Sequence, residues 1–191
     1  TYEKGMGLSQ QKIADMVKIQ IQRTGEAGTQ ILEKVSAYSK QVAAATGVDF
    51  KHIVEGVQEI ITNVKTFGNV QEDEAARIVG TLQQLGTSYR SFSNMVNKFM
   101  SFDTAASEIG KLTSVFGVHM DAMEMMQLAN EDEEEFLHRM RDSFIDQGIA
   151  VDDLTKAQRN LLASTLNLEP GEVENFFDPD LVETGLDEMI E

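Results

Sequence analysis

The sequence has no cysteine, no tryptophan and only two prolines, Pro170 and Pro179. Without cysteine, the chain has neither a disulfide framework nor a thiolate metal site. The scarcity of proline favours helices, because proline interrupts them. The sequence also lacks a long apolar run, and no stretch approaches the roughly 20 apolar residues that a membrane-spanning helix needs. We therefore predict that no segment spans a membrane.

Basic residues are scarce as well. The 191 residues include 32 Asp and Glu but only 16 Lys and Arg, so the formal net charge is −16 and the pI is about 4.5. Because DNA, RNA and anionic membranes need a basic face, we predict that nucleic acid is not a partner. The imbalance is confined to one half: residues 1–100 contain 10 acidic and 11 basic residues, whereas residues 101–191 contain 22 and 5.

What the sequence has is helical periodicity. In the first 67 residues, apolar side chains recur at spacings of three and four, which is typical of amphipathic helices that pack as in a coiled coil. The spacing leaves open whether the partner helix belongs to this chain or to another. The predicted packing interface consists of Ile31, Val35, Tyr38, Val42, Phe50, Ile53, Val57, Ile60, Val64 and Phe67.

Beyond residue 70 the apolar segments are shorter, and glycine or asparagine separates them. We predict an all-α fold in which long amphipathic helices are followed by a compact bundle of short helices. The predicted parts are a coiled-coil-like region over 1–67, a short-helix bundle over 68–177 and an acidic tail over 178–191. The helix starts are marked by four residues suited to N-caps, namely Asp49, Asn69, Asp121 and Asn130.

Catalytic and cofactor motifs are missing. The three histidines, His52, His119 and His138, do not have the spacing of metal ligands. The sequence has no glycine-rich phosphate loop and no serine in a nucleophile elbow. We therefore predict that the chain is not an enzyme and uses no metal or cofactor.

Three further patterns each have two interpretations. The acidic run at residues 131–135 fits the first turn of a helix better than a calcium loop. The apolar spacing over 154–176 is similar to a DNA-reading helix-turn-helix, but its second helix carries only acidic charges, which favours simple packing. A methionine cluster fits either a core or an adaptable groove for a partner helix. This cluster consists of Met120, Met123, Met125 and Met126.

Four segments of the second half share one spacing of apolar residues along their helices, which we call the helical cadence. They are FMSFDTAASEIGKL (99–112), FGVHMDAMEMM (116–126), ANEDEEEFLHRMRDSF (129–144) and RNLLASTLNL (159–168). Over residues 68–177 this cadence resembles that of bacteriophage tail tape-measure proteins and related large virion proteins. Those chains are usually several times longer and often contain an apolar membrane-active region, which this sequence lacks. The resemblance implies a role inside the tail, contacts with tube or baseplate subunits, and a chain that is a segment of a longer protein.

Two functions follow as expectations. The first is a structural virion component that assembles by helix packing as a homo-oligomer in the phage tail. The alternative is a soluble helical adaptor or regulator, cytoplasmic in location, that binds a basic partner through its acidic C-terminal half. An apolar interface self-associates with little dependence on salt, whereas an acidic adaptor loses affinity for its partner as salt rises.

Overall fold

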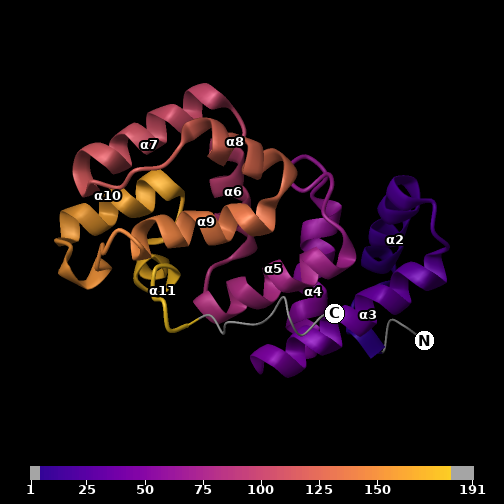
Figure 1. Cartoon of the computed structure of the whole chain (residues 1–191). Coiled ribbons are helices and arrows are strands. Elements are labelled where there is room, and N and C mark those ends of the chain that lie inside the picture. The colour runs from indigo at the N-terminus through magenta and orange to yellow at the C-terminus, as the bar shows by residue number, and fades with distance from the viewer. Residues whose placement is uncertain (1–4, 182–191) are drawn as a thin grey trace. The chain divides into compact units, whose positions relative to one another are not determined.

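The computed structural model describes residues 5–181 of the chain (Figure 1). Over these residues the chain forms ten α-helices and two 3₁₀ helices, and no residue lies in a strand. The predicted all-α fold is therefore confirmed. The chain divides between Gln84 and Leu85 into two compact units. Within the same residues, no helix is long and apolar enough to cross a membrane.

The first unit is built on three helices that pack pairwise against one another, followed by a fourth. The helices are α2 (Gln10–Thr24), α3 (Gly28–Thr46), α4 (Phe50–Thr62) and α5 (Glu72–Leu85). Gly28 lets α2 and α3 approach closely, since a Cβ at this position would lie 3.1 Å from a methyl carbon of Val17. The core of this unit includes Met16, Ile31, Val35, Val42, Ile53, Val57, Ile60, Ile78, Val79 and Leu82.

The turn after α4 differs from the predicted helix. The apolar spacing extended this helix through Val64 to Phe67, but α4 ends at Thr62. Asn63 causes the break, because its side-chain oxygen accepts a hydrogen bond from the amide of Thr66 at 3.4 Å and so competes with helical bonding. As a result, Val64 is 54% exposed, whereas Phe67 turns inward and is buried.

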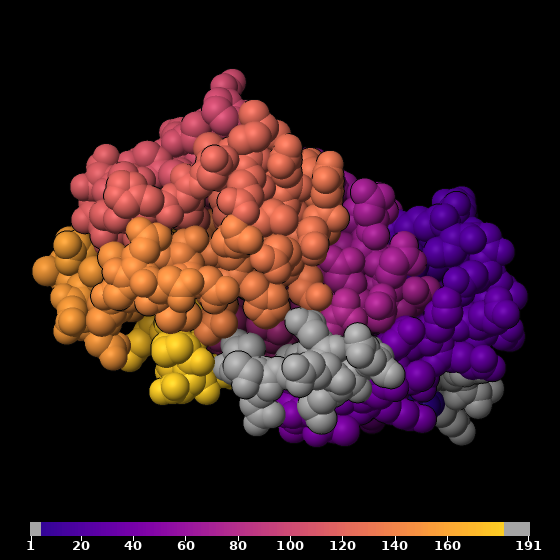
Figure 2. Space-filling model, viewed as in Figure 1, coloured from indigo at the N-terminus to yellow at the C-terminus, as the bar shows by residue number. Residues whose placement is uncertain are grey.

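The second unit contains the remaining helices. They are α6 (Tyr89–Phe99), α7 (Phe102–Phe116), α8 (Ala122–Glu131), α9 (Glu133–Ile145), η1 (Val151–Asp153), α10 (Lys156–Leu166), η2 (Pro170–Glu172) and α11 (Val173–Phe176). Helix α7 packs against α6, α8 and α10, and α8 also packs against α6 and α9. In the space-filling view, the pink surface of α7 adjoins the salmon to orange surface of α8 and α9 (Figure 2).

Phenylalanine rings fill the core of the second unit. The ring of Phe136 in α9 lies 6.4 Å from that of Phe92 and 5.5 Å from that of Phe99. Two turns further along α9, the ring of Phe144 lies 6.3 Å from that of Phe116. Because all five side chains are buried, and each contributes on the order of 1.5–3 kcal/mol, α9 is the central element of this core.

Most helix ends agree with the sequence, and two starts do not. Gly117 and Asn167 end α7 and α10 with φ angles of 72° and 57°, the left-handed conformation that glycine and asparagine adopt most readily. Asn69 and Asn130 are not N-caps. The first lies three residues before α5, and the second lies inside α8. Asp132 is the cap, because its side chain accepts from the amide of Glu135 at 3.1 Å.

The division of the chain falls after most of α5, so residues 72–84 belong to the first unit. The boundary predicted between residues 67 and 68 lies in the segment between α4 and α5, and these two helices have nearly the same length, 13 and 14 residues. The predicted acidic tail over 178–191 lies outside the described residues from position 182 onward.

Candidate binding pocket

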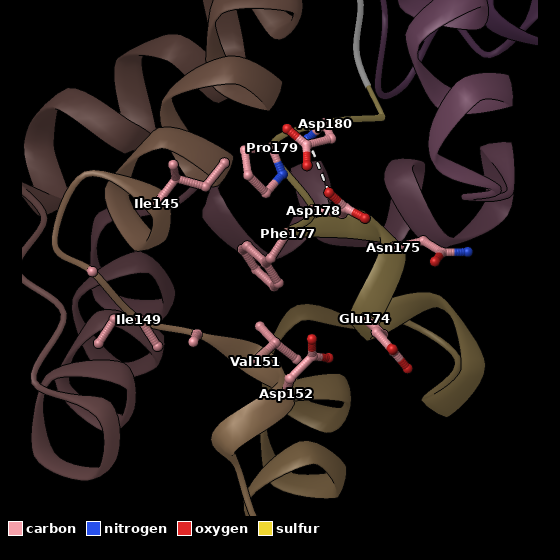
Figure 3. A pocket seen from close by; sticks show the side chains of 12 residues that line it. Ile145, Ile149, Val151, Asp152, Glu174, Asn175, Phe177, Asp178, Pro179 and Asp180 are labelled. Atoms are coloured by element: carbon pink, nitrogen blue, oxygen red, sulfur yellow. Dashed lines mark hydrogen bonds between the residues drawn. The ribbon is translucent and has the colours of Figure 1, made fainter.

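A pocket of about 520 Å³ opens on the second unit, beside the segment that leads out of α11 (Figure 3). Two stretches distant in the sequence form its walls, one from the end of α9 to η1 and one from α11 to residue 180. Its lining residues are Ile145, Gly148, Ile149, Ala150, Val151, Asp152, Glu174, Asn175, Phe177, Asp178, Pro179 and Asp180.

The floor of the pocket is apolar. Phe177 lies at its centre, flanked by Ile145 and Ile149 on one side and Val151 on the other (Figure 3). The ring of Phe177 is only 5% exposed and lies 4.2 Å from the ring of Phe144. This contact joins the pocket floor to the aromatic core of the unit, so the floor is a rigid surface.

Arg141 of α9 fixes one wall of the pocket. Its guanidinium donates a hydrogen bond of 2.7 Å to the carbonyl of Phe176 and one of 2.6 Å to the carbonyl of Asp178. Arg141 is buried, and the loss of hydration lowers the pKa of its side chain, against the opposing effect of Asp142 and Asp178. These two hydrogen bonds attach the wall formed by α11 and the residues after it to α9.

The rim of the pocket is acidic. Four of the twelve lining residues are Asp152, Glu174, Asp178 and Asp180, and none is basic. In residues 5–181, none of these four carboxylates forms an ion pair with a basic side chain. Two arginines reach the rim through backbone carbonyls: Arg141 donates to that of Asp178 at 2.6 Å, and Arg159 donates to that of Asp152 at 2.9 Å. The pocket therefore combines an apolar floor with a rim whose side chains carry only negative charge.

The predicted packing interface lies elsewhere, in the first unit. Seven of its ten residues are buried by the helices of the same chain: Ile31, Val35, Val42, Ile53, Val57, Ile60 and Phe67. Tyr38 and Phe50 are half-buried, and Val64 is exposed. The spacing thus located the core of the first unit, and the buried seven are covered within the chain.

Several predicted features are now placed. The acidic run forms the first turn of α9 with Glu133, Glu134 and Glu135, as the helix interpretation predicted. The methionine cluster is split, because Met125 is buried whereas Met123 is 47% exposed. No group of three or more His, Asp or Glu side chains is arranged to hold a metal ion within the described range.

Two polar contacts, one made by the half-buried Arg23 and one by the buried Glu172, were not predicted from the sequence. In the first unit, Arg23 donates to the carbonyls of Ile61 at 3.2 Å and Val70 at 3.4 Å and so joins α2 to the last turn of α4 and to the segment that follows it. Burial lowers the pKa of Arg23, and the charge of Glu72 opposes this. In the second unit, Glu172 binds the start of α6. Both contacts join residues 38 or more positions apart, so no local pattern indicated them.

A broader hollow of about 750 Å³ lies along α3. It contains charges of both signs, since Lys34 pairs with Glu26 at 2.6 Å. This ion pair neutralises part of the surface, and five of the seven residues that line the hollow carry charged or amide side chains. We therefore take the pocket over Phe177 as the candidate site.

Comparisons with protein-family models, curated proteins and solved structures find no match to this chain. The function must therefore be argued from the pocket and the surfaces of the two units.

Proposed function

We propose that the chain acts by binding, as an acidic helical adaptor that receives a basic segment of a partner protein on its second unit. The observation that carries this proposal is the pocket over Phe177, which has an apolar floor and four carboxylates among its lining residues. A lysine or arginine with an apolar neighbour fits both parts, because the apolar group covers the floor while the cation reaches the rim.

Energetics support a protein partner over a lone cation. Exposed ion pairs contribute only about 0.2–1 kcal/mol each, so the rim alone gives little affinity. Covering about 100 Å² of apolar surface adds on the order of 2.5 kcal/mol. A short peptide is therefore expected to bind with a dissociation constant of roughly 1 mM or somewhat tighter, and a whole partner with more contacts binds better.

The surrounding charge favours the same kind of partner. Residues 85–181 contain 18 acidic and 7 basic residues, so a basic partner is attracted before contact is made. The chain's own residues 182–191 are a poor occupant, because they contain four acidic residues and no basic one. Affinity for the partner should fall as the salt concentration rises.

The test maps the binding of a defined probe. The full chain, labelled with ¹⁵N, is titrated with the peptide acetyl-Leu-Lys-Arg-Leu-amide and followed by NMR. We expect the largest shift changes at the amides of Ile149, Val151 and Phe177, which line the pocket. Changes confined to other residues, or no saturation of the shifts, would contradict the proposal.

The helical cadence of residues 68–177 supports a second candidate, the structural component of a phage tail. On this proposal the chain assembles with its own kind and with tube or baseplate subunits. Because seven of the predicted interface residues are covered within the chain, assembly would use other surfaces. Sedimentation of the full chain separates the two candidates: salt-insensitive self-association favours the tail component, and a monomer favours the adaptor.

A further inference from the structure

A second apolar surface lies on the α7–α8 pair, away from the residues that line the pocket. Phe102 at the start of α7 is 45% exposed, and Met123 near the start of α8 is 47% exposed. Met126 lies one turn after Met123 and is half-buried, and residues three apart share a helix face. A group of exposed apolar side chains, unlike a single one, is typical of an interaction site.

One side chain connects the two helices at this surface. The amide of Asn130 donates to the carbonyl of Met100 at 2.9 Å and to that of Met126 at 2.8 Å. The start of α7 is therefore held beside the last turns of α8. Met123, Met126 and Asn130 recur at spacings of three and four and so share one side of α8, and Asn130 brings the segment just before Phe102 to that side. We call the surface with Phe102, Met123 and Met126 the α7–α8 face.

The α7–α8 face is bordered by negative charge. Asp103 follows Phe102, and Glu131 follows Asn130; both are exposed, and neither forms an ion pair in the described part of the chain. Glu124, beside Met123, is different, because it pairs with Arg139 of α9. These two carboxylates therefore lie where the start of α7 meets the end of α8, next to the exposed phenylalanine.

We infer that the α7–α8 face binds an amphipathic helix of the partner protein, with leucine-like side chains on one side and basic residues at its flanks. Methionine suits this role, because its unbranched side chain adapts to different apolar shapes. Helices that insert one apolar face between two others are a recurrent mode of protein recognition. This inference rests on the proposed function in that the partner is basic, but it concerns a separate surface.

Charge decides among the possible occupants. An anionic lipid surface is disfavoured by Asp103 and Glu131, because membrane binding of this type depends on basic residues. A second copy of this chain is disfavoured as well, since each copy carries a formal charge of −16. A basic helix from another protein satisfies both the apolar centre and the acidic border.

The test uses a synthetic helix of leucine and lysine, about 15 residues long, with its leucines on one face. Its affinity for the full chain is measured by calorimetry. The double variant Phe102→Ser, Met123→Gln is expected to bind at least about tenfold more weakly, because two apolar anchors are lost. The matched control is Val115→Gln, Leu161→Gln, which removes two apolar side chains of the same unit that are 40% and 38% exposed, and it should change affinity less than about twofold.

Four results would overturn the inference. They are equal losses in the test and control variants, equal affinity for a scrambled peptide of the same composition, binding of the chain to anionic vesicles through Phe102 and Met123, and self-association that these two substitutions abolish. The pocket variant Asp152→Asn, Glu174→Gln keeps the two proposals apart. If only this variant no longer binds the synthetic helix, the synthetic helix binds in the pocket. The α7–α8 face is then excluded as its binding site, and the proposed function stands.

Discussion

The carboxylate of Glu172 accepts a hydrogen bond of 2.6 Å from the hydroxyl of Ser91, a residue 81 positions earlier in the chain. The same carboxylate accepts from the backbone amides of Ser88 at 2.7 Å and Glu169 at 2.8 Å. An anion is thus placed at the N-terminus of α6, where the helix dipole favours it. This contact ties η2 to α6 and thereby fixes the segment that continues into α11 and the pocket.

Replacing Glu172 should destabilise the second unit. Glu172→Ala removes three acceptor contacts to a charged group and leaves the amide of Ser88 without this partner. We expect a loss of about 1.5–3 kcal/mol in the free energy of unfolding. Denaturant unfolding followed by circular dichroism measures it, with Glu174→Ala, an exposed neighbour, as the control. Equal stability of the two variants would show that the contact contributes nothing.

The first unit offers a test of whether its periodic apolar residues form the core of the chain or an interface between chains. Ile53 is fully buried inside the chain, so Ile53→Ala should lower the free energy of unfolding by about 2–5 kcal/mol. The loss should not depend on protein concentration. Val64→Ala is the control, and at this exposed position we expect a change within about 0.5 kcal/mol. A loss of self-association without a loss of stability would mean that Ile53 lies at an interface between chains.

The helix boundaries show which features of the fold local sequence can predict and which it cannot. The glycine and asparagine stops, such as Gly117 and Asn167, were predictable because a left-handed residue is a local requirement. The start of α9 was not, because Asn130 and Asp132 are both suitable caps. Asn130 instead bonds the carbonyl of Met100, thirty residues away, and α8 continues past it. A tertiary contact therefore decides which of two locally equivalent residues caps α9.

The candidate site could not be predicted for the same reason. Each wall of the pocket is unremarkable in the sequence: one is a turn around Gly148, and the other is an acidic stretch after Phe177. Their meeting depends on Arg141 and on the contact of Phe144 with Phe177, which join positions 33 to 37 apart. The acidity of the second half was visible in the sequence, but the apolar floor beneath four of its carboxylates was not.

Asp132 provides a direct test of the corrected cap. Asp132→Ala removes the side-chain acceptor for the amide of Glu135 and should lower stability by about 0.5–2 kcal/mol. Asp132→Asn retains an acceptor and should lose much less. Thermal unfolding compares the two variants; if alanine and asparagine behave alike, the cap is not a source of stability.

Arg141 is a positioning residue of the pocket. Arg141→Met keeps an apolar stem of similar length but leaves the carbonyls of Phe176 and Asp178 without their donors. We expect a loss of about 1–3 kcal/mol in stability and a several-fold weaker affinity for acetyl-Leu-Lys-Arg-Leu-amide. Arg141→Lys, with a single ammonium group, should be intermediate in both measurements. Unchanged peptide affinity in the Met variant would separate Arg141 from the pocket.

The central claim is that the acidic rim over Phe177 binds a basic segment, and titration calorimetry tests it most directly. The probe is acetyl-Leu-Lys-Arg-Leu-amide, and the full chain is compared with Asp152→Asn, Glu174→Gln and with Glu55→Gln, Glu59→Gln. Both double variants remove two negative charges from exposed positions, but only the first removes them from the pocket. We predict a clear loss of affinity for the first and nearly unchanged affinity for the second. Equal affinity in all three proteins, or equal loss in both variants, would contradict the claim.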